Sequence, residues 1–125
     1  MSTTVLVAED ELLIAMDVME ELDAAGFTAV GPFARTSQAM DYCRRHTPDC
    51  AVLDVRLADG DSFPLADLLA ERNVPVVFHS GHASGKALSE RYPYGRVCPK
   101  PARSSAIATA VTELCRIAAA AQASA

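Results

Sequence analysis

The chain has 125 residues, of which 50% are hydrophobic and 22% are charged, and this size and composition fit one globular domain with a single core. The net charge at pH 7 is −5, and the 11 basic residues form no long stripe that could neutralise a phosphate backbone, so we expect no direct nucleic-acid binding. The apolar runs are far shorter than the roughly 20 residues that span a bilayer, and no basic leader precedes them, so we expect a cytoplasmic protein without membrane insertion.

The first quarter of the chain predicts a strand, a helix and a second strand. Residues 5–8 form a short continuous apolar run, which is typical of a parallel strand that is covered on both faces. Residues 12–22 carry apolar side chains at helical spacing, and Gly26 follows as a stop signal. Residues 29–30 are a weaker apolar run beside glycine and proline, which favours an edge strand.

The second quarter and the middle of the chain repeat this alternation. Residues 39–43 predict a helix and residues 50–53 a buried strand. Gly60 is predicted to form a turn with positive φ, and Ser62 to cap the next helix with its side chain. That helix is expected over residues 63–70.

The last part of the chain predicts four more elements. Residues 76–78 form another buried strand, and residues 97–98, flanked by proline, form an edge strand. Between them, residues 84–92 predict a short helix weakened by an internal glycine. A final helix is expected over residues 107–118.

Five strands that alternate with five helices predict an α/β fold with right-handed crossovers and an open parallel sheet. We expect the strand order 2-1-3-4-5, with helices on both faces of the sheet. One domain is expected over residues 1–121, followed by an alanine-rich tail over residues 122–125.

Chemically reactive side chains follow four of the five predicted strands. Glu9 and Asp10 come after the first strand, and Asp54 comes after the third. Ser80 follows the fourth strand and Lys100 the fifth. In an open α/β sheet these strand ends form a crevice where ligands bind. Three carboxylates in one crevice repel each other unless a divalent cation lies among them, and hard oxygen ligands indicate Mg²⁺.

This combination of groups is typical of phosphoryl transfer. Asp54 is the predicted nucleophile, with Glu9 and Asp10 placed to hold metal beside it. Lys100, which we expect on the opposite side of Asp54, supplies a positive charge, and Ser80 supplies a hydroxyl group.

The set Glu9-Asp10, Asp54, Ser80 and Lys100-Pro101 resembles the receiver domains of response regulators, and the resemblance covers the whole chain. It implies a flavodoxin-like three-layer sandwich of five parallel strands and five helices. It also implies that Asp54 accepts a phosphoryl group from a histidine kinase or a histidine phosphotransferase.

The resemblance further assigns the metal ligands and two other roles. Asp10, Asp54 and the backbone carbonyl of Arg56 would bind Mg²⁺ directly, and Glu9 would act mainly through a water molecule. Ser80 would turn toward the phosphoryl group. Lys100 would pair with that group, and its peptide bond to the following proline would be cis.

The segment Phe78-His79-Ser80-Gly81 is also similar to a subclass of single-domain receivers with Phe-x-Thr/Ser-Gly after the fourth strand. His79 and His82 are interpreted as surface-loop residues. The chain departs from many receivers at Val97, where they carry an aromatic ring that moves on activation. We therefore expect the usual output face to be altered.

The leading interpretation is a stand-alone phosphorylation switch and not an enzyme, which signals by docking an unknown downstream protein or by phosphorelay. A phosphohydrolase with an aspartyl nucleophile is the first alternative, although Arg56 stands where a second aspartate would act as general acid. A flavodoxin-like cofactor binder would need a phosphate loop in place of Glu9-Asp10-Glu11. The third alternative is an interaction module that is not phosphorylated.

Overall fold

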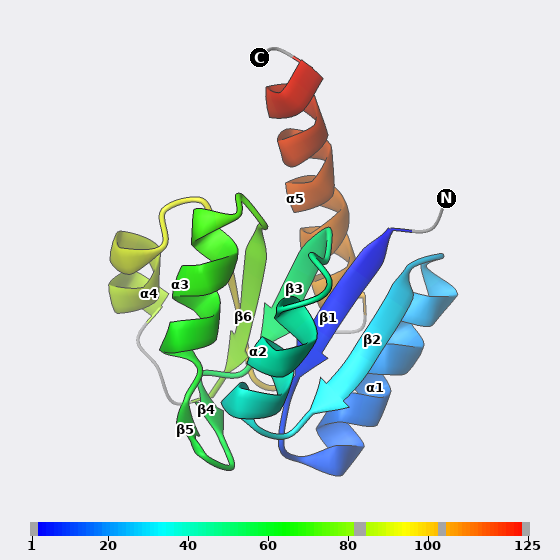
Figure 1. Ribbon diagram of the computed structural model, residues 1–125. Coiled ribbons are helices and arrows are strands. Elements are labelled where there is room, and N and C mark those ends of the chain that lie inside the picture. The colour runs from blue at the N-terminus through cyan, green and yellow to red at the C-terminus, as the bar shows by residue number, and fades with distance from the viewer. Residues whose placement is uncertain (1–2, 82–84, 103–104, 124–125) are drawn as a thin grey trace.

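The computed structural model describes residues 3–81, 85–102 and 105–123. Within these ranges five parallel strands form one sheet in the order β2-β1-β3-β6-β7 (Figure 1). The strands are β1 (Thr4–Ala8), β2 (Thr28–Phe33), β3 (Cys50–Leu53), β6 (Val76–Ser80) and β7 (Arg96–Pro99). Counted along the chain, this is the order 2-1-3-4-5, so the predicted sheet is confirmed.

Five helices cover the two faces of the sheet and complete three layers (Figure 1). One face carries α1 (Leu12–Ala24) and α5 (Ala106–Ala123). The other face carries α2 (Thr36–Cys43), α3 (Phe63–Glu71) and α4 (Gly85–Arg91). The C-terminal turns of α5 project beyond the edge of the sheet.

Alternating side chains of the strands form two hydrophobic clusters, one under each helical layer. Leu53 of β3 and Phe78 of β6 face α2, α3 and α4, whereas Val52 and Val77 face α1 and α5. These side chains are almost completely buried, and each contributes roughly 1.5–3 kcal/mol relative to an exposed position. Because both faces of β3 and β6 are packed, the ends of these strands are held firmly at one edge of the sheet.

Strand β2 is longer than the two residues that the sequence predicted. It runs on through Gly31 and Pro32, whose peptide bond is cis, and its pairing with β1 shifts register between Leu6 and Ala8. Proline is tolerated here because β2 lies at the edge of the sheet. The apolar pattern covers only part of the strand because Thr28, Gly31 and Pro32 are exposed, and Gly31 and Pro32 separate Phe33 from the apolar pair Ala29-Val30.

A small antiparallel hairpin of β4 (Arg56–Leu57) and β5 (Gly60–Asp61) follows β3 and was not predicted. Two-residue strands are too short to give an alternating pattern. The predicted positive φ of Gly60 is confirmed at 124°. Ser62 occupies the N-cap position of α3, but its hydroxyl does not cap the helix; it donates a 2.6 Å hydrogen bond to the carbonyl of Asp54 instead.

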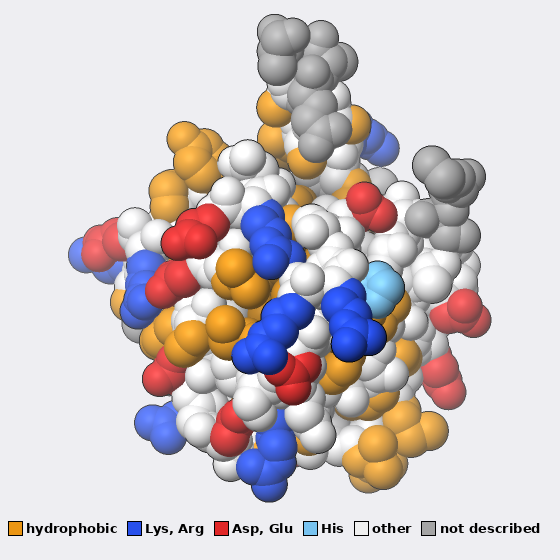
Figure 2. Space-filling view, in the orientation of Figure 1, with side chains coloured by type: hydrophobic (Ala, Val, Ile, Leu, Met, Phe, Trp, Pro, Cys, Tyr) orange, Lys and Arg blue, Asp and Glu red, His pale blue; other side chains and the backbone are white. Residues whose placement is uncertain are grey.

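The described side chains on the face formed by α2, α3 and α4 include both charges. Figure 2 shows basic and acidic side chains interleaved there. Across the described ranges, no helix has both the length and the apolar character needed to cross a membrane.

Candidate functional site

Three carboxylates meet at the edge of the sheet where β1 and β3 end. Glu9 and Asp10 follow β1, and Asp54 follows β3. The two strands are paired neighbours, and the Asp54 amide donates a 2.9 Å hydrogen bond to the Ala8 carbonyl, which brings the strand ends together. One oxygen from each carboxylate lies within 4.8 Å of the other two. Glu9 and Asp54 are buried, whereas Asp10 is exposed.

Lys100, which follows β7, bridges two of these acids. Its Nζ lies 2.8 Å from Oδ2 of Asp54 and 2.6 Å from Oε1 of Glu9. The expectation that it lies on the opposite side of Asp54 from Glu9 is therefore wrong, because the two buried carboxylates share one ammonium group. The peptide bond from Lys100 to Pro101 is cis, as expected.

The protonation of this cluster reflects competition between burial and charge. Burial raises the pKa of Glu9 to about 7, although Lys100 and the Glu11 amide both lower it. Burial opposes the charge of Lys100, but its hydrogen bonds with Asp54 and Glu9 outweigh this effect and raise its pKa above the ordinary value. Lys100 is therefore firmly charged, whereas Glu9 gains and loses its proton near neutral pH.

The other predicted site residues lie around the same edge. Ser80 is buried at the end of β6, and its carbonyl accepts a 3.2 Å hydrogen bond from the Lys100 amide. Arg56 begins β4, and its amide donates a 3.4 Å hydrogen bond to Oδ1 of Asp54. The hydroxyl of Ser62 anchors the Asp54 backbone from the other side. Sequence reasoning missed this last contact because a serine before a helix normally predicts a cap.

The donor set at this edge fits a hard divalent cation. All three acids offer carboxylate oxygens, and in the described part of the chain no cysteine or histidine belongs to a cluster with metal-ligand spacing. Oxygen-only sites with one exposed carboxylate are suited to Mg²⁺, which keeps several of its waters. The residues present therefore agree with the predicted ion.

His79 lies in β6 and is only 6% exposed, so its interpretation as a surface-loop residue is wrong. It extends the apolar run of residues 76–78 by one strand position. The sequence did not predict its burial, because polar side chains are usually exposed. Burial lowers its pKa, the nearby charge of Lys100 lowers it further, and Asp54 opposes this shift. His82 lies outside the described residues.

We predict that acid destabilises the protein partly through His79. Because its folded-state pKa lies below the unfolded value of about 6.5, the stability tied to its neutral form is complete above pH 6.5 and is lost as the pH falls below it. Replacing His79 with glutamine should flatten the decline in unfolding free energy between pH 7 and 5, measured by urea titration. The exposed His46 changed to glutamine serves as control, and an equal flattening there would contradict the assignment.

An aromatic cluster that the sequence did not reveal connects the end of β6 with α3 and α4. The ring of Tyr92 lies 5.0 Å from that of Phe78 and 6.1 Å from that of Phe63. The Tyr92 hydroxyl donates a 2.7 Å hydrogen bond to Asp67 of α3. Val97 of β7 packs against the hydrophobic core cluster to which Phe78 and Tyr92 belong, and Tyr92 directly follows α4.

Separate comparisons with known proteins agree on one family. The sequence model of the response regulator receiver domain matches residues 5–112. The transcriptional regulatory protein PdtaR of Mycobacterium tuberculosis is 35% identical over 74 residues, which are 58% of this chain and 36% of PdtaR. The phyllosphere-induced regulator PhyR of Methylorubrum extorquens is 28% identical over 116 residues, 90% of this chain and 43% of PhyR. The chain therefore spans less than half the length of these relatives.

Solved structures agree with this result over nearly full lengths. A response regulator receiver protein from Sinorhizobium medicae has a TM-score of 0.84 and 28% identity, and the match covers 94% of this chain and 97% of that one. The solution structure of SdrG from Sphingomonas melonis has a TM-score of 0.76 and 34% identity, covering 90% and 96%. Fold, acidic edge and sequence thus lead to one conclusion: the chain belongs to the response regulator receiver domain family.

Proposed function

We propose that this receiver domain is a phosphorylation switch in which Asp54 accepts a phosphoryl group from a phosphohistidine on a histidine kinase or histidine phosphotransferase. The observation that carries the proposal is the shared ion pair of Lys100 with Asp54 and Glu9, beside Asp10, at one edge of the sheet. The ammonium group of Lys100 lies beside the buried Asp54 carboxylate, so it could stabilise the negative charge that a phosphoryl group would bring.

In this proposal each residue has a defined task. A carboxylate oxygen of Asp54 attacks phosphorus, the bond from phosphorus to the donor histidine nitrogen breaks, and the imidazole leaves. Lys100 donates hydrogen bonds to the transferred group, and the Ser80 hydroxyl approaches it from β6. Bound Mg²⁺ would neutralise charge between the acids and the phosphoryl oxygens.

The metal ligands in the proposal are Asp10, Asp54 and the carbonyl of Arg56, with Glu9 acting through a water molecule. The hydrogen bond from the Arg56 amide to Asp54 supports this, since it keeps the hairpin backbone next to the acids. The side chains of Glu9 and Asp54 accept from Lys100 as well, so their orientation is set before any ion binds.

A hydrophobic surface beside the acids supports docking of a protein donor. Leu12, Leu13 and Met16, at the start of α1, are 65%, 79% and 49% exposed. Figure 2 shows a patch of hydrophobic side chains over the beginning of this helix, at the lower right. This segment begins two residues after Asp10. We propose that the phosphodonor packs here, while the downstream protein recognises the phosphorylated form by docking or by phosphorelay.

The proposal is tested by incubating the protein with acetyl phosphate and Mg²⁺ and measuring its intact mass. We expect a base-labile gain of one phosphoryl group that is absent in Asp54→Asn and in excess EDTA. Asp23→Asn, which removes an exposed acid at the far end of α1, is the matched control and should behave like the wild type. A gain that persists in Asp54→Asn, or steady turnover of many phosphoesters, would overturn the proposal and favour a hydrolase.

A further inference from the structure

Two of the four cysteines form a pair across the interface between the sheet and α5. Cys50 begins β3 and is completely buried, whereas Cys115 lies in α5 and is partly buried. Cys50 belongs to the hydrophobic cluster under α1 and α5, and Cys115 packs against this cluster beside Val111 and Leu114. The two thiols are hydrogen-bonded to each other. The proposed phosphorylation uses neither of them.

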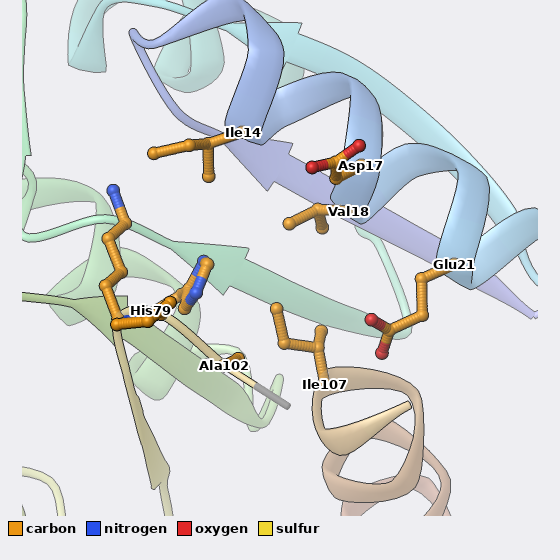
Figure 3. Close-up of a pocket in the computed structure, with 9 residues that line it drawn as sticks. Ile14, Asp17, Val18, Glu21, His79, Ala102 and Ile107 are labelled. Carbon is orange, nitrogen blue, oxygen red and sulfur yellow. The ribbon is translucent and has the colours of Figure 1, made fainter. Parts of the chain in front are cut away.

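Helix α5 is held over this face of the sheet by contacts along its length. At its start, Oε2 of Glu21 on α1 accepts a 2.6 Å hydrogen bond from the Ala108 amide. Figure 3 shows the Glu21 carboxylate next to the first turn of α5, and Ile107 points from this turn toward α1. Further along the helix, Leu114 is buried in the same cluster as Cys50. The packing therefore fixes α5 on β3 and keeps the two thiols together.

The hydrogen bond makes the two thiols chemically unequal. It lowers the pKa of Cys115, although burial and the charge of Asp49 oppose this shift. It raises the pKa of Cys50, as burial also does, and contact with the backbone of Ala51 opposes this shift. Cys50 therefore keeps its proton, and Cys115 is the sulfur that ionises first. Because the thiolate is the nucleophile in thiol chemistry, we expect Cys115 to react first.

The other two cysteines provide a comparison within the same chain. Burial raises the pKa of Cys43 and of Cys98 above the ordinary value. Cys43 lies in the hydrophobic cluster on the opposite face of the sheet. Cys98 is partly buried, as Cys115 is, and packs against the same cluster. Exposure alone would give Cys98 and Cys115 similar reactivity, whereas the hydrogen bond from Cys50 favours Cys115.

We propose that Cys50 and Cys115 are a modification site, at which a peroxide produces an intramolecular disulfide between β3 and α5. The Cys115 thiolate attacks one peroxide oxygen, the O–O bond breaks, and Cys115 becomes a sulfenic acid while hydroxide leaves and takes up a proton. The Cys50 sulfur then attacks the Cys115 sulfur, the S–O bond breaks, and the hydroxyl leaves as water with the Cys50 proton. Two thiols are thus oxidised to a disulfide, and one peroxide is reduced to two waters. The inference goes beyond phosphorylation and does not involve Asp54.

The first test treats the folded full chain with hydrogen peroxide, blocks the remaining thiols with N-ethylmaleimide and maps the unreduced protein by mass spectrometry. Trypsin separates the four cysteines into the peptides 36–44, 46–56, 97–103 and 104–116. We expect a loss of two hydrogens from the protein mass and a disulfide that joins peptide 46–56 to peptide 104–116. The same treatment in concentrated urea is the control, and it should give mixed pairings because packing no longer selects the partners.

Rates and variants assign the role of each sulfur. In the wild type, Cys115 should be oxidised at least about tenfold faster than Cys98, because a larger fraction of it is thiolate. In Cys50→Ala the disulfide cannot form, so dimedone should trap a sulfenic acid at Cys115, and this oxidation should be slower than in the wild type because the hydrogen bond is lost. Cys98→Ala removes a partly buried cysteine at the same cluster and should form the disulfide like the wild type.

The disulfide should form without disturbing the fold. It closes a long loop between residues 50 and 115, so the urea midpoint of the oxidised protein should lie above that of the reduced protein, and dithiothreitol should reverse this shift. Asp54→Asn should be oxidised like the wild type, so the result is independent of the phosphorylation assay. Failure of Cys50 and Cys115 to link in the folded protein, equal oxidation rates at Cys98 and Cys115, or a lower urea midpoint after oxidation would overturn the proposal.

Discussion

Replacing Lys100 with methionine should lower the free energy of unfolding by about 3–5 kcal/mol in metal-free buffer, the usual effect of removing one partner of a buried ion pair. The side chains of Glu9 and Asp54 are only 3% and 6% exposed, and the Lys100 ammonium contacts both. Methionine fills similar space but leaves the buried Asp54 carboxylate without its counter-charge, and it removes the group that lowers the pKa of Glu9, so Glu9 takes up a proton. The measurement is urea unfolding at pH 7 in the presence of EDTA.

The chain offers a matched control, because its only other lysine is Lys86, which lies exposed on α4. Lys86→Met should change stability by less than about 0.5 kcal/mol. If uncompensated charge is the cause, the double variant Lys100→Met, Asp54→Asn should be more stable than Lys100→Met alone. A loss no larger in Lys100→Met than in Lys86→Met would show that the ion pair contributes little.

The same variant links stability to the proposed function. If Lys100 stabilises the transferred phosphoryl group, Lys100→Met should slow the mass gain from acetyl phosphate by on the order of 100-fold, the usual effect of losing one oriented donor. Added Mg²⁺ should restore stability more in the variant than in the wild type, since it supplies the missing positive charge. The stability and the rate of mass gain together distinguish a lysine that only stabilises the fold from one that also stabilises the transferred phosphoryl group.

The sheet and the acidic edge were predictable because they rest on strong local signals. The continuous apolar runs at residues 5–8, 50–53 and 76–78 are typical of strands covered on both faces. Once those strands are parallel, their ends lie at one edge, and residues such as Glu9 and Asp54 must approach each other. The topology, and not any single motif, therefore brought these positions together.

The contacts within the site were not predictable from these signals. Lys100 bridges Glu9 and Asp54 because two buried carboxylates share one cation, and this depends on burial that a sequence does not display. Ser62 likewise donates to the Asp54 carbonyl because that carbonyl is buried beside it. His79 was assigned to a surface loop because a polar residue next to Ser80 predicts exposure. In each case tertiary packing decided the partner.

Strand β2 and the hairpin β4–β5 show a second limit of prediction from sequence. Both contain a glycine with positive φ, Gly31 at 125° and Gly60 at 124°. Sequence patterns identify glycine as a candidate turn residue, but they do not tell whether it lies inside a strand or in open space. The structure separates the two cases through their surroundings, and this difference leads to a direct experiment.

Gly31→Ala should destabilise the protein by about 3–5 kcal/mol, the sum of positive-φ strain of roughly 1–3 kcal/mol and a backbone clash. A Cβ at position 31 would lie 2.6 Å from the Val7 carbonyl oxygen and 3.0 Å from the Phe33 amide nitrogen. Neither backbone atom can move without disturbing the pairing of β1 with β2. Urea unfolding measures the loss.

Gly60→Ala is the matched control, because its φ is nearly the same and no atom lies within 4 Å of the added Cβ. It should lose only the strain, so the difference between the two variants, about 2 kcal/mol, isolates the clash at Gly31. Equal losses of stability would mean that the backbone of β2 moves enough to relieve the clash.

The clash also reaches the acidic edge, because the Phe33 carbonyl accepts a 2.9 Å hydrogen bond from the Glu9 amide. Gly31→Ala should therefore weaken Mg²⁺ binding under folded conditions, whereas Gly60→Ala should weaken it less.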